Sequence, residues 1–193
     1  DRLDDMQREL IVSVFKTQLP TLDKVEFNVE AQAMNETSAP ITITQNEYMR
    51  RMKDMSRLQQ GMSFYGEMPD MYNVVLNTNH KLVKDILNAS ESDISSLLSP
   101  INTEIKGLNA RRDAINQANK DKKYDEISQE SKDELNKCEE DIRLQNEKKN
   151  NIIADYSKGI KRVHQLIDLA LLQNGMLRGE ALTKFVNRSL QMI

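Results

Sequence analysis

The sequence predicts an α+β fold, in which a small three-stranded sheet with helices precedes an antiparallel helical hairpin and a C-terminal pair of helices. Apolar residues recur every three or four positions along most of the 193 residues, which is the period of an amphipathic helix. Three short segments instead have the alternation or the β-branched residues of strands. The composition, 38% hydrophobic and 30% charged with no Trp, is lean for one globular core and typical of long exposed helices.

The N-terminal part alternates between helix and strand. Residues 1–19 have apolar residues at helical spacing, and this helix is expected to end before Pro20 because proline cannot continue it. Charged and apolar residues alternate over residues 24–30, which is the pattern of a half-buried strand. Residues 41–44 predict a second strand, and residues 46–60 return to helical spacing.

A third strand completes a small α+β unit over residues 1–89. Residues 71–76 are the strand, and the polar residues 77–79 resemble the start of a helix whose first turns are residues 81–87. Strands and helices of this number and length are enough for one small sheet with helices packed on it.

Residues 90–157 predict an antiparallel helical hairpin with a polar joint at residues 119–123. Ser99-Pro100 is expected to start its first helix, because proline is favoured at the first helical position. Widely spaced aliphatic residues form two series with a seven-residue period. The series consist of Ile101, Ile105, Leu108 and Ile115 and of Leu135, Cys138, Ile142, Ile152 and Tyr156, with Arg112, Gln145 and Lys149 in the remaining seam positions.

The C-terminal residues predict two apolar-striped helices, 158–173 and 180–193, separated by Asn174-Gly175. Chain ends are usually frayed and polar, so an apolar face that continues to Ile193 indicates a partner. A second copy of the chain is the simplest partner, and we expect a homodimer. The expected interface residues are Ile160, Val163, Leu166, Ile167, Ala170, Leu171, Leu182, Phe185, Val186, Leu190 and Ile193.

Methionine is concentrated in helix 46–60 and the loop that follows it. Six of the ten methionines lie between Met49 and Met71, and those of the helix share one face. One interpretation is a face that packs on the core; the other is an adaptable binding surface, because the unbranched thioether repacks easily. The glycine-bounded apolar loop 61–70 favours binding. The face consists of Tyr48, Met49, Met52, Met55 and Leu58, with Met62 beyond the helix.

No catalytic, cofactor-binding or metal-binding constellation is predicted. The glycines form no phosphate-binding loop, and His80 and His164 are far apart, so each is interpreted as a cap or a surface residue. The lone Cys138 is interpreted as a small seam residue and fits a reducing cytoplasm. A net charge of −3 gives no reason to expect nucleic acid, and no segment has the length of a membrane span. The charged joint 119–123 is interpreted as a solvated hairpin tip.

Three segments together resemble the C-terminal domain of the 90-kDa heat-shock chaperones of the bacterial HtpG type. They are the Met-rich helix over residues 46–53, the strand and Asn-x-x-His helix start over residues 72–83, and the tail over residues 164–193. The resemblance covers residues 1–88 and 158–193. The chain begins Asp-Arg-Leu without an initiator methionine, so we expect a piece of a longer protein.

This resemblance implies a parent that is an ATP-dependent molecular chaperone, with ATP and magnesium bound in an N-terminal domain outside this chain and no cofactor here. It implies that the last two helices of each protomer form an intersubunit four-helix bundle. It also implies that the methionine face of helix 46–60 contacts unfolded or partly folded client proteins. The chain ends at Ile193 without the acidic tail of eukaryotic members, and residues 90–157 have no counterpart in the family pattern.

Three regions are therefore expected: an α+β part over residues 1–89, an inserted hairpin over residues 90–157 and dimerisation helices over residues 158–193, with Gly159 as the joint. The alternative is a structural coiled-coil adaptor whose hairpin binds a partner protein. The polar residues in the hairpin seams argue against a strong partner-binding zipper. An enzyme has no support among the residues of this fragment.

Overall fold

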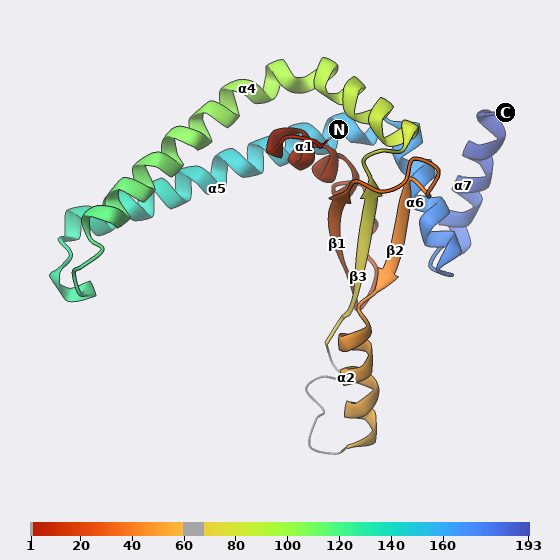
Figure 1. Cartoon of the computed structure of the whole chain (residues 1–193), viewed down its shortest axis with the longest axis horizontal. Coiled ribbons are helices and arrows are strands. Elements are labelled where there is room, and N and C mark those ends of the chain that lie inside the picture. The colour runs from red at the N-terminus through yellow and green to blue at the C-terminus, as the bar shows by residue number, and fades with distance from the viewer. Residues whose placement is uncertain (1, 60–67) are drawn as a thin grey trace.

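The computed structural model describes residues 2–59 and 68–193 and has the predicted α+β fold (Figure 1). The sheet has the order β1-β3-β2, and all three predicted strands are present. The central strand β3 pairs in parallel with β1 and antiparallel with β2. The strands are β1 (Val25–Gln32), β2 (Ile41–Gln45) and β3 (Asp70–Asn77).

The pleat of the sheet separates an apolar face from a polar one. Val74 on β3 lies opposite Val29 on β1 and Ile43 on β2, and all three side chains are buried. Because side chains alternate along a strand, the residues between them, such as Glu30 and Thr42, point to the other face. The sheet can therefore be covered on one side only.

Helix α1 (Asp5–Lys16) lies on the apolar face and is shorter than the predicted 1–19. It begins after Asp4 because the Asp4 carboxylate accepts a hydrogen bond from the Gln7 amide at 2.7 Å, while the Asp4 amide donates to the Gln7 side chain at 3.2 Å. Met6, placed on the apolar stripe by its spacing, is exposed.

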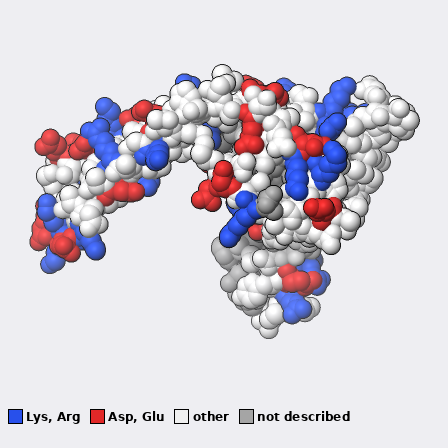
Figure 2. Space-filling model, turned by 45° about the horizontal axis from the view of Figure 1, so that its top comes forward, with Lys and Arg blue, Asp and Glu red and all other residues white. Residues whose placement is uncertain are grey.

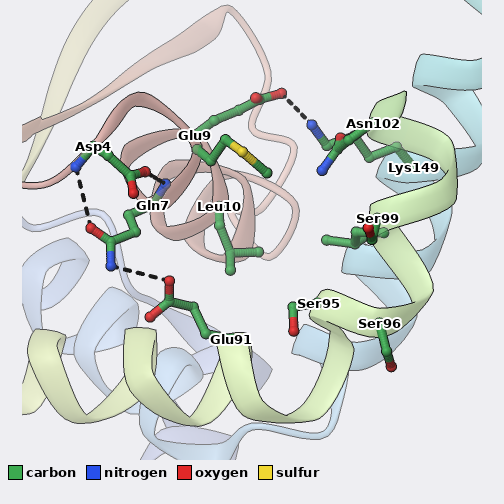
Figure 3. A pocket seen from close by; sticks show the side chains of 12 residues that line it. Asp4, Gln7, Glu9, Leu10, Glu91, Ser95, Ser96, Ser99, Asn102 and Lys149 are labelled. Carbon is green, nitrogen blue, oxygen red and sulfur yellow. Dashed lines mark hydrogen bonds and ion pairs between the residues drawn. The ribbon is translucent and has the colours of Figure 1, made fainter. Parts of the chain in front are cut away.

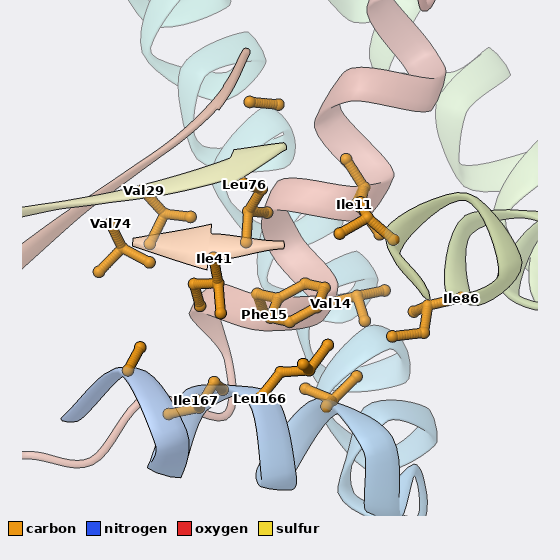
Figure 4. Packing of buried hydrophobic residues seen from close by; sticks show 14 of the residues in the cluster. Ile11, Val14, Phe15, Val29, Ile41, Val74, Leu76, Ile86, Leu166 and Ile167 are labelled. Carbon is orange, nitrogen blue, oxygen red and sulfur yellow. The ribbon is translucent and has the colours of Figure 1, made fainter. Parts of the chain in front are cut away.

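Helix α6 (Lys161–Gln173) lies beside α1 on the same face of the sheet (Figure 4). Between them lies one continuous core, to which the first turns of the next long helix also contribute. Close packing of this kind leaves no free volume for a larger side chain. Its side chains include Ile11, Val14, Phe15, Val29, Ile41, Val74, Leu76, Ile86, Leu166 and Ile167.

The long helix α4 (Lys81–Ala118) corrects one prediction. It runs without interruption through Pro100, so the expected helix start at Ser99-Pro100 is wrong. The buried side chains of Leu98 and Ile101 lie on either side of the proline, and their packing keeps the backbone helical across it. Since Pro100 cannot donate to the Ser96 carbonyl and its ring crowds that turn, proline bends the helix. In Figure 1 α4 arches over α1.

Helix α5 (Gln129–Lys158) returns antiparallel to α4 after a short turn at η1 (Tyr124–Glu126) and completes the predicted hairpin. Cys138 is buried between the two helices, as expected for a seam residue. Near the body, Ile153 is fully buried, and the expected seam residue Ile152 beside it is partly buried against the same core. Lys149 is also buried. Its ammonium lies 2.7 Å from the carboxylate of Glu9 on α1, so the charge of this seam residue is compensated by a residue outside the hairpin.

The predicted joint at Gly159 is confirmed, because Gly159 caps α5 and α6 begins two residues later. Helix α7 (Gly179–Gln191) follows α6 after a turn in which Gly175 and Gly179 have φ of +66° and +61°. These left-handed conformations favour glycine. Both predicted C-terminal helices are present. The division into 1–89, 90–157 and 158–193 stays a prediction, and α4 crosses its first boundary as one helix.

Candidate functional site

The residues predicted for the dimer interface fall into two sets. The inner set faces the sheet and α1 and belongs to the protomer's own core, with side chains that are between 0 and 9% exposed. Two more residues, Ile160 and Leu182, are half-buried against that core. The inner set consists of Val163, Leu166, Ile167, Ala170, Leu171 and Phe185.

The outer set is exposed on α7 and at its end. Val186, Leu190 and Ile193 have exposed fractions of 46, 67 and 102%, although they are all apolar. Leu169 and Leu172 on α6 and Met192 are also exposed, and the sequence analysis did not select them. Leu169 and Leu172 lie on the side of α6 away from its buried stripe. The run from Leu169 to Leu172 is apolar around a full turn of α6, which indicates two covered faces, and that signal would have found them.

A polar network joins α6 to α7 between these two sets. Arg188 forms an ion pair with Asp168, and its Nε donates to the Gln165 side chain at 2.9 Å. The Gln165 amide in turn donates to the Ser189 hydroxyl at 2.6 Å. The Arg188 and Asp168 side chains are only 19 and 20% exposed. This network fixes how α7 lies against α6, and therefore which apolar side chains remain on the outside.

The second candidate surface is helix α2 (Glu47–Leu58), which extends beyond the end of the sheet (Figure 1). Of the predicted client-binding residues, Tyr48, Met55 and Leu58 are exposed, and Met49 and Met52 are half-buried. None of the five lies in the core. The accompanying loop prediction cannot be followed here, because residues 60–67, Met62 among them, lie outside the described residues.

Helix α2 begins at Asn46, whose side chain accepts a hydrogen bond from the Met49 amide at 3.2 Å. Its polar face is held by ion pairs along the helix, of which Arg50 with Glu47 is the shortest at 3.0 Å. The hydrogen bond and positive charge of Arg50 lower the pKa of the Glu47 carboxyl. Lys53 reaches Asp70 at the start of β3 at 2.9 Å and ties the helix to the sheet.

The remaining candidates have local roles. His80 caps α4, since its Nδ1 accepts from the Leu82 amide at 3.1 Å, and His164 lies 3.0 Å from the Lys158 carbonyl oxygen. Both agree with the interpretation as caps or surface residues. In the described part of the chain, no group of His, Cys, Asp or Glu could hold a metal ion. No described helix is long and apolar enough to cross a membrane.

Charge is distributed differently over the two ends of the molecule. Figure 2 shows Lys and Arg side chains mixed with Asp and Glu along the hairpin and at its tip. At the tip Lys123 and Glu126 are linked by a hydrogen bond, which fits the prediction of a solvated joint. In the same view the outermost part of the end that carries α6 and α7 is uncharged, and a group of Lys and Arg side chains lies beside it.

Comparison with known proteins identifies close relatives over the whole chain. A protein named Chaperone protein HtpG from Bacteroides thetaiotaomicron is 50% identical over 193 residues, which are 100% of this chain and 28% of that protein. The HtpG of Bacteroides fragilis gives the same identity and coverage, and that of Porphyromonas gingivalis is 38% identical over the same span. The chain therefore spans about 28% of the length of these relatives. No protein-family model matches it, and no solved structure matches it significantly.

Proposed function

The chain is a homologue, along its whole length, of one segment of the HtpG chaperones, and we propose that it is the homodimerisation and client-contact part of such a chaperone. The observation that carries the proposal is the apolar outer face of α6 and α7, which the protomer leaves exposed. Exposed apolar side chains gathered on one pair of helices are costly in water unless a partner covers them.

The proposed dimer is isologous, so the outer face of one protomer packs on the same face of the other. A standard interface buries about 800 Å² on each partner, and a permanent dimer uses a larger and more apolar surface. Two helices from each protomer would then form a four-helix bundle. The side chains in contact would be Leu169, Leu172, Val186, Leu190, Met192 and Ile193, with Leu182 at the edge.

The proposed client contact lies on α2. Its exposed Tyr48, Met55 and Leu58 are supported by the half-buried Met49 and Met52, and flexible thioethers suit partners of different shapes. In a symmetric dimer each protomer contributes one such helix. Clients on this proposal are unfolded or partly folded proteins, bound through apolar contacts and without catalysis by this chain.

ATP and magnesium are proposed only for the longer parent protein and not for this chain. Hydrolysis of ATP is proposed for a domain that would lie in the part of the relatives not covered by this chain. No nucleic acid or membrane partner is proposed. The lone cysteine continues to favour a reducing compartment, and we propose the cytoplasm.

Light scattering of the variant Val186→Ser with Leu190→Ser tests the dimer. Both side chains are exposed in the protomer, so the fold is retained while the interface loses two apolar contacts, and we expect a monomer. The matched control is Leu97→Ser with Leu144→Ser, which removes two exposed leucines from the hairpin and is expected to leave a dimer. Deletion of residues 176–193 is less clean, because it also removes Leu177 and Phe185 from the core. A variant that stays fully dimeric would contradict the proposed interface.

The adaptor alternative places the function on the hairpin instead. Its seam is closed by contacts within the protomer, with Ile101 and Cys138 buried and Lys149 paired with Glu9. These contacts support the hairpin as a self-contained arm, so the chaperone proposal is preferred.

A further inference from the structure

The bend of α4 opens a pocket of about 470 Å³ between α4, α1 and the inner end of α5 (Figure 3). Its α4 wall includes Ser95, Ser96 and Ser99, the turn immediately before Pro100. Pro100, which favours a bend in α4, directly follows this wall. The volume lies within the range of about 300–1,000 Å³ that is usual for ligand sites.

The pocket has an apolar floor and a mouth rich in hydrogen-bond acceptors. Leu10 and Leu98 form the floor, and the exposed Met6 lies beside them. Ser95, Ser96 and Ser99 line the α4 side, and the Ser96 carbonyl has no helical donor because Pro100 lacks an amide hydrogen. A ligand with an apolar stem and a donor at its end would match this arrangement.

Charge within the pocket is predominantly negative. Its lining contains the carboxylates of Asp4, Glu9 and Glu91, and Lys149 is the only cation among the lining residues. Lys149 is already paired with Glu9, whereas the only hydrogen bond that Glu91 accepts from a side chain within residues 2–59 and 68–193 comes from the neutral Gln7, at 3.1 Å. Asp4 likewise accepts from the Gln7 amide. Two carboxylates therefore face the pocket without a cation of their own among its lining residues.

The pocket continues into a second hollow of about 750 Å³ along the hairpin. The two share Met6, Glu9, Asn102 and Lys149, so they form one elongated groove. The second hollow is lined by side-chain amides that can both donate and accept, as the backbone of an extended peptide requires. These amides belong to Asn102, Asn109 and Asn146.

The two ends of the groove differ in charge. The second hollow contains Lys106 and Arg112, with Asp113 as the partner of Arg112. The unpaired negative charge is therefore confined to the bend, and this fixes where a positive side chain of a ligand would lie.

We propose that this groove binds an extended peptide segment in which a lysine or arginine is flanked by apolar residues. The apolar side chains rest on Leu10 and Leu98, and the cationic side chain lies between Asp4 and Glu91. The argument rests on charge complementarity and on the two adjoining hollows, whose volumes of about 470 and 750 Å³ exceed what a single amine would fill. The site lies on neither α2 nor the outer face of α6 and α7, so its test is independent of the tests of the proposed dimer and client surfaces.

The test is fluorescence anisotropy of the 193-residue chain with three labelled nine-residue peptides. The first has a lysine between leucines at its centre; the second replaces this lysine with norleucine, which has the same stem without charge; the third replaces it with glutamate. We expect the lysine peptide to bind roughly threefold to tenfold more tightly than the norleucine peptide, and the glutamate peptide to bind weakest. Salt should reduce this preference. Equal binding of all three peptides would overturn the proposal.

Two pairs of variants locate the site. Glu91→Gln is expected to remove most of the preference for lysine over norleucine, whereas Glu104→Gln, the same change on another face of α4, preserves it. Ser95→Leu fills the pocket and weakens binding of every peptide, whereas Ser92→Leu does not. Unchanged melting temperatures confirm that the variants fold. Loss of binding on Met55→Ser with Leu58→Ser, with Ser95→Leu silent, would overturn the groove and assign the peptides to α2.

Discussion

Helices α2 and α6 have similar lengths and similar apolar stripes, yet the apolar face is buried in α6 and largely exposed in α2. Helix α6 buries five apolar side chains against the sheet and α1. Helix α2 has only Ser56 buried, and its largest apolar side chains remain in contact with water. An apolar stripe indicates that one face of a helix needs to be covered. The position of the helix relative to the sheet decides what covers that face. The comparison teaches that α6 supports the fold, whereas α2 is available for a partner.

The largest expected effect is on α6. Ile167→Ala deletes a fully buried side chain and is expected to lower the free energy of unfolding by about 2–5 kcal/mol. Leu58→Ala on α2 removes a side chain that is 86% exposed and is expected to change it by less than about 0.5 kcal/mol. Urea unfolding at one fixed chain concentration measures both. Equal losses in the free energy of unfolding for the two variants would contradict the comparison.

The next effect tests how α6 positions α7. Arg188→Met leaves the poorly exposed Asp168 without its cation, and we expect a cost of about 1–3 kcal/mol together with weaker dimerisation. Lys184→Met is the control, because its pair with Glu180 is exposed to water and contributes little to stability. Sedimentation of both variants gives the dimer dissociation constants. If the two variants dimerise equally well, the network does not position the interface.

A third prediction concerns binding by α2. Met55→Ser with Leu58→Ser removes two exposed apolar side chains and is expected to weaken binding of a reduced, unfolded model protein several-fold, because less apolar surface is buried on contact. The melting temperature is expected to stay nearly unchanged, since neither side chain belongs to the core. A large fall in the melting temperature would instead mark these residues as part of the fold.

The smallest effect is electrostatic. Because Arg50 lowers the pKa of Glu47, this pair stabilises α2 above the ordinary pKa of a glutamate, and the contribution disappears as the pH falls through the lowered value. NMR titration of the Glu47 carboxyl carbon should give a pKa below the ordinary 4.5, and Arg50→Gln should return it towards that value. The same pKa in both chains would show that the pair does not form in solution.

The local spacing of apolar residues was sufficient to predict the strands and most helices. The alternation of residues 24–30 was confirmed by β1, and the apolar spacing of α6 found its apolar face. The side chains of that face were expected in a dimer interface, but they lie in the protomer's own core. Pro100 misled the prediction because a local preference for a helix start was outweighed by the packing of Leu98 and Ile101 on either side of it. Near the end of α5 the seam residue Ile152 does pack against the core, but the adjacent Ile153, which was not predicted, is buried more deeply. The seven-residue period could not find Ile153, because its burial depends on elements outside the hairpin seam.

The candidate surfaces were predictable in part. The exposed Tyr48, Met55 and Leu58 were named from the sequence, as were Val186 and Leu190. The groove under α4 was not, because its lining comes from three helices that are distant in sequence and its volume depends on a bend.

The sequence by itself determined the elements of this protein: the periods of its apolar residues define which segments are helices and strands and which faces avoid water. Its relatives add that these elements match, over the whole chain, one segment of the HtpG chaperones. Only the tertiary structure decided which apolar faces are covered within one protomer. Burial depends on what lies opposite a face, and for α6 that is the sheet and α1, whereas the outer side of α7 and the end of α2 face solvent.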